Sequence, residues 1–155
     1  MFGKLVEKLF GKKNRSIAFL DGDQPIPGIL AAYQKHLAGK VDETHLIRLK
    51  ADDQNEPKPL RKVTDINKVY LSGFTSGKEV VDKFIGAGIQ KAVADGYTKI
   101  VVVSSDFDFI DLFKMAAMLD RRCESITFTL IVPKAQGRLA EAVGTQVNNI
   151  KVVKA

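Results

Sequence analysis

The hydrophobic and polar positions of this chain follow two periods in turn, which predict alternating strands and helices. Short apolar runs bounded by polar residues predict strands at 16–21, 44–50, 68–72, 99–104, 126–132 and 150–153. Apolar stripes at helical spacing predict helices between them, at 27–37, 77–94, 109–122 and 138–143. We expect the polar segment 51–65, which contains two prolines, to form the one long loop. This order predicts a doubly wound, three-layer α/β sandwich with a mostly parallel central sheet.

Two of these predicted elements, the strand over 99–104 and the helix over 77–94, are the most informative about the fold and the position of a site. Residues 99–104 (KIVVVS) are almost continuously apolar, which is typical of a central parallel strand buried on both faces. Asp82 lies in the first turn of the helix over 77–94, at the edge of its apolar stripe, so we expect its carboxylate near the end of the sheet. The alternative is an ion pair with Lys78, four residues earlier. The stripe itself consists of Val81, Phe84, Ile85, Gly88, Ile89 and Ala92.

The first 15 residues form a distinct basic arm. Their apolar positions recur at helical spacing with lysines mostly opposite, which predicts a short amphipathic helix over 2–11, with the stripe Phe2, Leu5, Val6, Leu9 and Phe10. Three uses of this helix stay open: docking on the domain or on a partner chain, lying on an anionic membrane, or contacting nucleic acid. Two phenylalanines in so short a helix favour docking. The arm is therefore a candidate contact for a homo-oligomer or a partner protein.

Composition narrows the class of protein. A length of 155 residues fits one domain over 16–155 after the arm, and 45% hydrophobic residues exclude a largely disordered chain. No apolar run is long enough to span a membrane, and the N-terminus lacks the pattern of a signal peptide. The single cysteine excludes an internal disulfide, so we expect a cytoplasmic protein. Of the net charge of +6, the arm carries +4, so charge alone does not indicate a nucleic-acid partner.

Acidic residues follow two of the predicted strands. Asp21 and Asp23 come at the end of the first, and Asp106 and Asp108 follow the strand over 99–104. Ligand sites of open α/β sheets lie at such carboxyl ends, and the glycine-rich loop of a dinucleotide site is missing here. Crowded carboxylates repel each other, and a hard divalent cation such as Mg²⁺ or Mn²⁺ relieves that repulsion. Helix capping by the residues at 105–111 is the alternative interpretation of the second cluster.

Three motifs in these positions resemble those of one known family. An acid-Gly-acid sequence ends the first strand, a lysine-containing turn leads to a helical Asp, and Ser-x-Asp-x-Asp-Phe follows a buried strand. Here they read DGDQ at 21–24, SGKEVVD at 76–82 and VVSSDFDF at 102–109. The chain from residue 16 to 155 thus resembles the NYN domains of the PIN-like nuclease superfamily. Two positions depart from the family pattern, Gln24 in place of Asn and Ser105 in place of Gly.

The resemblance implies a PIN-like fold and a metal-dependent ribonuclease that hydrolyses RNA phosphodiester bonds. It implies one or two Mg²⁺ or Mn²⁺ ions held by four aspartates, Asp21, Asp82, Asp106 and Asp108. Asp21 and Asp106, anchored at strand ends, are the expected direct ligands, and the other two bind through water or complete a second position. Weaker candidates for contacts with the substrate or the ligands are Asp23, Gln24, Lys78, Ser104 and Asp111.

Two other classes of function stay open. One is a non-catalytic, regulatory NYN-like module that binds RNA or protein, with the basic arm as its adaptor. The other is a phosphatase-like or receiver-like domain that forms an aspartyl phosphate. The latter needs a lysine after a late strand, and Lys134, after the strand over 126–132, is in that place.

Overall fold

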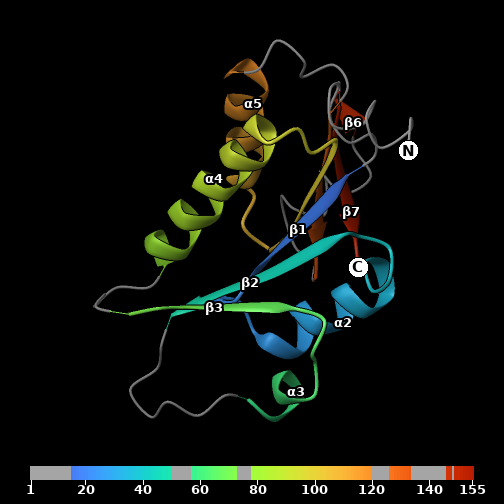
Figure 1. The fold of residues 1–155 in the computed structure, drawn as a ribbon, viewed down its shortest axis with the longest axis vertical. Coiled ribbons are helices and arrows are strands. Elements are labelled where there is room, and N and C mark those ends of the chain that lie inside the picture. The colour runs from blue at the N-terminus through green and yellow to red at the C-terminus, as the bar shows by residue number, and fades with distance from the viewer. Residues whose placement is uncertain (1–14, 50–56, 73–77, 120–125, 134–145, 148) are drawn as a thin grey trace, which may run out of the picture.

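A computed structural model describes residues 15–49, 57–72, 78–119, 126–133, 146–147 and 149–155. These residues form one sheet with helices on both sides (Figure 1). In chain order the elements are β1 (Ser16–Asp21), α2 (Ile26–His36), β2 (Glu43–Leu49), α3 (Lys58–Arg61), β3 (Asn67–Leu71), α4 (Lys78–Ala94), β4 (Lys99–Val103), α5 (Phe109–Leu119), β5 (Thr127–Val132), β6 (Gln146–Val147) and β7 (Ile150–Lys154).

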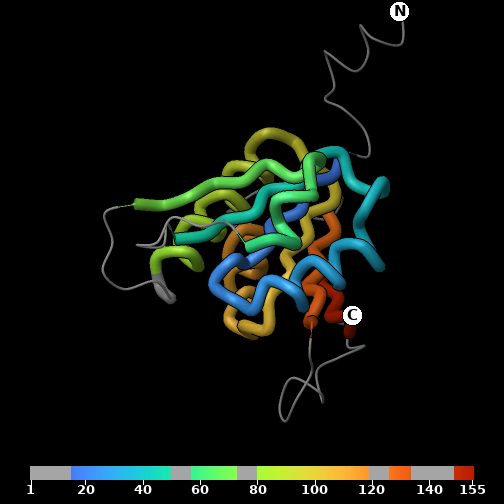
Figure 2. The backbone as a smooth tube through the Cα atoms, turned by 90° about the horizontal axis from the view of Figure 1, so that it is seen from below, coloured from blue at the N-terminus to red at the C-terminus, as the bar shows by residue number. Residues whose placement is uncertain are grey.

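The strands lie in the order β3-β2-β1-β4-β5-β7-β6, and the first six of these are parallel. The short β6 pairs antiparallel with β7 at the edge. β3 and β7 consequently lie toward opposite sides of the molecule (Figure 2). The chain moves outward from β1 to β3 and then crosses back through α4 to β4, on the other side of β1. The direction of winding therefore reverses between β1 and β4, and ligands of such sheets bind beyond the carboxyl ends of these two strands.

Two separate cores hold the helices against the sheet, one on each face. Ala18, Leu20, Val101 and Val103 pack against α2 and the short α3. Ile17, Phe19, Ile100 and Val102, which alternate with them along the same strands, pack with α4 and α5. This alternation buries β1 completely and β4 apart from its first residue, as the continuous apolar pattern predicted. The α/β sandwich with a mostly parallel sheet is therefore confirmed.

Three expectations about the elements need correction or stay outside this description. The predicted loop over 51–65 contains α3, because Pro57 and Pro59 fit the start of a short helix that buries Leu60. The two-residue strand β6 has too short a pattern to be predicted. The amphipathic helix over 2–11 and the helix over 138–143 fall outside the described residues.

Helix α4 ends at Ala94, as the sequence predicted. Gly96 has a φ of +88°, a backbone conformation that glycine adopts without strain. The amides of Gly96 and Tyr97 donate to the carbonyls of Val93 and Ala92 and close the last turn. Among the described helices, none has the length and apolar character that a membrane crossing requires.

Candidate functional site

A small acidic cavity lies at the carboxyl ends of β1 and β4, where the winding of the sheet reverses. Its volume is about 250 Å³. Residues after both strands and one residue of α4 line it: Asp21, Asp23, Gln24, Asp82, Ser105, Asp106 and Phe107. Three of the four aspartates predicted as metal ligands therefore meet in one cavity, at the position that the topology favours for a ligand.

Asp21 is the most buried of these carboxylates, with 1% of its surface exposed. Its Oδ2 accepts a hydrogen bond of 2.6 Å from the Ser104 hydroxyl, and its Oδ1 accepts one of 3.1 Å from the amide of Asp23. Burial raises the pKa of Asp21, and the nearby charges of Asp23 and Asp106 act in the same direction, whereas the two hydrogen bonds lower it. The position of this carboxylate is thus fixed by neighbours on both strands.

Gly22 brings the loop after β1 into close contact with β2. Its amide donates to the carbonyl of Ile47 over 2.7 Å. A Cβ at residue 22 would lie 2.4 Å from that carbonyl oxygen and 2.8 Å from the Cβ of Arg48. Only glycine fits this approach, so the turn that presents Asp21 and Asp23 depends on the missing side chain.

The residues after β4 form a chain of side-chain hydrogen bonds. The Ser104 hydroxyl, fully buried, accepts a bond of 3.0 Å from the Asp106 amide while it donates to Asp21. Oδ1 of Asp106 in turn accepts a bond of 2.9 Å from the amide of Asp108. Asp106 thus supports the turn before α5, in line with the capping interpretation, and it also lines the acidic cavity.

Asp82 reaches the cavity from the first turns of α4 and is half-buried, as its place at the edge of the apolar stripe predicted. Burial, a hydrogen bond with Asp106 and the charges of Asp21, Asp106 and Asp23 together raise the pKa of Asp82 to about 7. Carboxylates this close share a proton because they cannot all ionise without repulsion. Repulsion among the carboxylates of the cavity thus favours the protonated form of Asp82.

We expect Asp82→Asn to stabilise the metal-free protein at pH 8. The folded protein keeps a proton on Asp82 up to a pKa of about 7, whereas the unfolded chain releases it near 3.8. The free energy of unfolding therefore falls as the pH rises through this window. Because Asp82 is partly solvated, we expect a gain of only about 1 kcal/mol at pH 8, which vanishes near pH 4. Urea unfolding in EDTA at pH 8 and at pH 4 measures this gain in stability. An equal gain at the two pH values would contradict the raised pKa of Asp82.

Some of the predicted site residues do not line the acidic cavity or fall outside the described residues. Asp108 and Asp111 are exposed and do not line the cavity, although Asp108 is held beside it through its amide. The side chain of Lys78, the first residue of α4, and the whole of Lys134 fall outside the described residues. Phe107, which the sequence did not mark, lines the cavity with 40% of its surface exposed. Its place inside the Ser-x-Asp-x-Asp-Phe motif is the signal that would have found it.

The donor set of the cavity suits a hard divalent cation. Within the described segments, no three His, Cys, Asp or Glu side chains are arranged around a common point as a complete metal cage. Mg²⁺ commonly takes only one or two carboxylates and completes its shell with water and substrate phosphates. Asp21 and Asp106 could supply such a pair, and a cation between them would relieve the carboxylate repulsion that helps to raise the pKa of Asp82.

Comparisons with known proteins identify no relative of this chain: a scan against protein-family models and searches of curated proteins and of solved structures found no match.

Proposed function

We propose that this protein is a ribonuclease that hydrolyses RNA phosphodiester bonds with Mg²⁺ or Mn²⁺ held at the acidic cavity. One observation carries the proposal: Asp21, Asp82 and Asp106 come from three separate elements and meet where the winding of the sheet reverses. The raised pKa of Asp82, about 7, supports the proposal further. It reflects repulsion among the carboxylates, and a bound cation would relieve that repulsion.

The residues of the cavity have distinct tasks in this proposal. Asp21, oriented by Ser104, and Asp106, oriented by its own turn, would hold the metal. A bound divalent ion supplies a Lewis acid for the phosphate and a water of lowered pKa. Asp82, whose pKa is raised to about 7, would have to lose its proton for a cation to bind beside it, so metal affinity would rise with pH through about 7.

The substrate class rests on the resemblance to NYN domains. The DGDQ motif supplies Asp21 and Asp23, the Ser-x-Asp-x-Asp-Phe motif supplies Asp106, and the SGKEVVD motif supplies Asp82 to the lining of the cavity. The family resemblance, a PIN-like assignment of the fold, RNA as substrate and a cytoplasmic location are parts of this proposal. Asp108, exposed beside the cavity, would act through water or on the phosphate rather than as a direct ligand.

The experiment that tests the proposal follows cleavage of a 5′-labelled single-stranded RNA by the purified full chain. We expect products in Mn²⁺, fewer in Mg²⁺ at equal concentration, and none in EDTA. Calorimetric titration of Mn²⁺ at pH 6 and pH 8 should show tighter binding at the higher pH. Cleavage that is unchanged in EDTA, or no binding of Mn²⁺ at either pH, would contradict the proposed function.

A further inference from the structure

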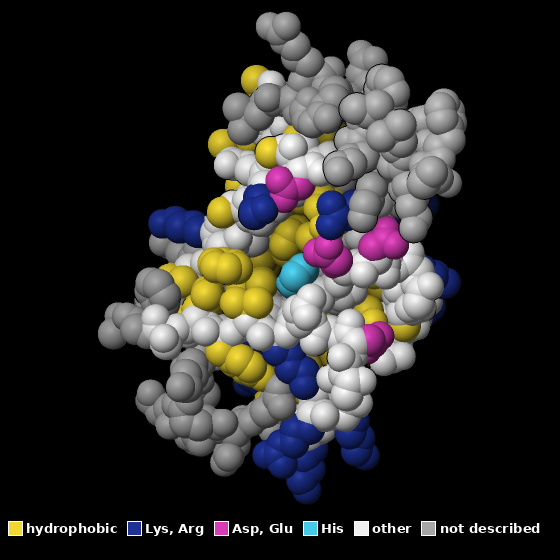
Figure 3. Space-filling view, in the orientation of Figure 1, with side chains coloured by type: hydrophobic (Ala, Val, Ile, Leu, Met, Phe, Trp, Pro, Cys, Tyr) yellow, Lys and Arg dark blue, Asp and Glu magenta, His cyan; other side chains and the backbone are white. Residues whose placement is uncertain are grey.

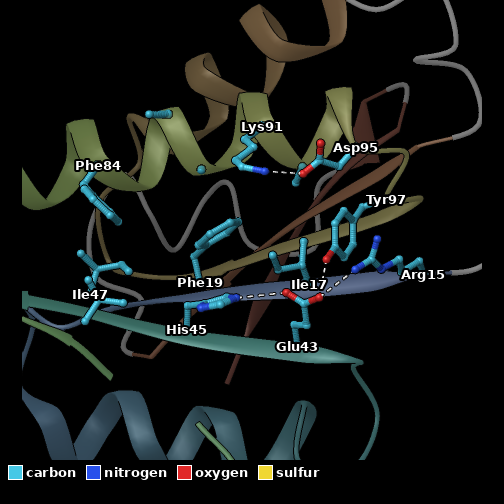
Figure 4. A pocket seen from close by; sticks show the side chains of 14 residues that line it. Arg15, Ile17, Phe19, Glu43, His45, Ile47, Phe84, Lys91, Asp95 and Tyr97 are labelled. Atoms are coloured by element: carbon cyan, nitrogen blue, oxygen red, sulfur yellow. Dashed lines mark hydrogen bonds and ion pairs between the residues drawn. The ribbon is translucent and has the colours of Figure 1, made fainter. Parts of the chain in front are cut away.

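A second, larger cavity lies on the face of the sheet that α4 and α5 cover. It is a groove of about 560 Å³ between α4 and strands β1–β3 (Figure 4). We call it the sheet groove, and its apolar wall consists mainly of Ile17, Phe19, Ile47, Val69, Phe84 and Gly88. The space-filling view shows hydrophobic side chains gathered here around a histidine, with charged groups at one end (Figure 3).

One member of the apolar stripe of α4 is exposed at the groove. Phe84 belongs to the apolar stripe of α4, yet 44% of its surface is exposed, and its ring hangs from the helix toward Ile47 (Figure 4). One turn later, a Cβ on Gly88 would lie 2.8 Å from the Phe19 ring, so α4 sits directly on β1 there. The helix thus touches β1 in the middle of the groove, whose lining continues to Phe84 on one side of Gly88 and to Ala92 and Asp95 on the other.

The polar side chains of the groove bond one another. Glu43 pairs with Arg15 at 3.0 Å and with His45 at 3.2 Å, and it accepts a hydrogen bond from the Tyr97 hydroxyl. The Arg15 guanidinium lies 4.1 Å from the centre of the Tyr97 ring. Groups that satisfy one another in this way offer little to orient a polar ligand, so the groove favours an apolar occupant.

We propose that the sheet groove is the docking site for the apolar stripe of the N-terminal arm of this same chain, residues 2–11. The stripe places Phe2, Leu5, Val6, Leu9 and Phe10 on one side of a predicted helix, with its lysines left for solvent. Two aromatic and three aliphatic side chains match the aromatic and aliphatic wall of the groove. Helix-in-groove recognition uses such spacing.

The connection to the groove supports this occupant over others. Arg15, the last residue of the arm, lines the groove and directly precedes β1, so the arm joins the domain at the rim of the groove. A ten-residue helix is about 15 Å long, and a six-residue strand such as β1 is about 20 Å. With residues 12–14 as the turn, the predicted helix over 2–11 would run back beside α4 along β2, whose Glu43, His45 and Ile47 line the groove. The covalent link also gives the arm an effective concentration in the millimolar range.

The test measures how accessible Phe84 is in the full chain. In a Cys123→Ser background, Phe84→Cys supplies a single thiol in the groove, and its rate of maleimide labelling is followed. We expect labelling to be about 10-fold faster when Leu9→Lys breaks the apolar stripe, because the arm then leaves the groove open. Glu7→Gln makes the same change of one charge on the polar side of the arm and should leave the rate unchanged.

A second thiol separates docking from unfolding. Met118→Cys, at a position 86% exposed on α5, should be labelled equally fast with every arm variant. Equal labelling of residue 84 with and without Leu9→Lys would overturn the proposal. Protection that grows with protein concentration, with a dimer mass in light scattering, would overturn it in favour of a second copy. Leu9-dependent binding to phosphatidylglycerol vesicles without protection in solution would overturn it in favour of a membrane. None of these outcomes involves the acidic cavity.

Discussion

Asp106→Asn is expected to reduce Mn²⁺-dependent RNA cleavage by about 1,000-fold, which corresponds to about 4 kcal/mol in activation free energy. The change removes one negative charge from the pair of carboxylates that would hold the metal. Asparagine keeps the shape of the side chain and an oxygen for the Asp108 amide, so the turn before α5 is preserved. Initial rates of cleavage over a range of Mn²⁺ concentrations measure the effect.

Asp111→Asn is the matched control for this experiment. Asp111 lies in the first turn of α5, exposed and away from the lining of the cavity, and the change removes the same charge. Its cleavage rate should stay within about two-fold of the wild type, since long-range effects of exposed charges are screened by salt. If Asp106→Asn retained the wild-type rate, the cavity would not be the catalytic site.

Gly22→Ala is expected to destabilise the protein by about 3 kcal/mol, the upper end of the usual cost of forcing an extra carbon into a packed site. The new Cβ would meet the backbone of β2, at the carbonyl oxygen of Ile47, and a backbone group cannot rotate away as a side chain can. The loop would have to withdraw from β2, and Asp21 and Asp23 would move with it. Urea unfolding in EDTA measures the loss.

Gly28→Ala provides the contrast because the same methyl group is added where there is room. Gly28 lies in α2, and its Cβ would meet only the Pro133 side chain at an ordinary 3.7 Å. We expect a gain of about 0.5 kcal/mol, because alanine is the better helix former. Equal effects of the two substitutions would show that the close approach of residue 22 to β2 does not determine stability.

Much of this fold could be predicted from local patterns. The runs that form β1 and β4 are apolar at every position except their ends, Ser16, Asp21 and Lys99, because both faces of these strands are covered. This pattern marks them as central without knowledge of the topology. The start of α3 was missed because Pro57 and Pro59 indicate a loop as readily as a helix start. The exposure of Phe84 could not be predicted, because helical spacing shows which side of α4 is apolar, but not how far the neighbouring strands extend beneath it.

The candidate site was only partly predictable, for a related reason. The sequence could identify Asp21 and Asp106 because they lie at the ends of predicted strands. It could identify Asp82 because helical spacing places it at the edge of the apolar stripe. The sequence marked Ser104 as a candidate contact of a ligand carboxylate, but that this carboxylate is Asp21 depends on the register that pairs Leu20 with Val103. Asp106 lines the cavity whereas Asp108 is exposed, because the turn between β4 and α5 points their side chains in different directions. The sequence motif does not show the geometry of this turn. The proton shared around Asp82 follows from distances that no spacing in the sequence supplies.

The most direct test of the central claim is anomalous diffraction from a crystal of the full chain grown with Mn²⁺ at pH 8. The account predicts an anomalous peak inside the acidic cavity, at about 2.1 Å from carboxylate oxygens of Asp21 and Asp106, the distance typical of small divalent cations. It also predicts that the hydrogen bond between Asp82 and Asp106 is broken there. A cavity without a peak, with that hydrogen bond intact at saturating Mn²⁺, would contradict it.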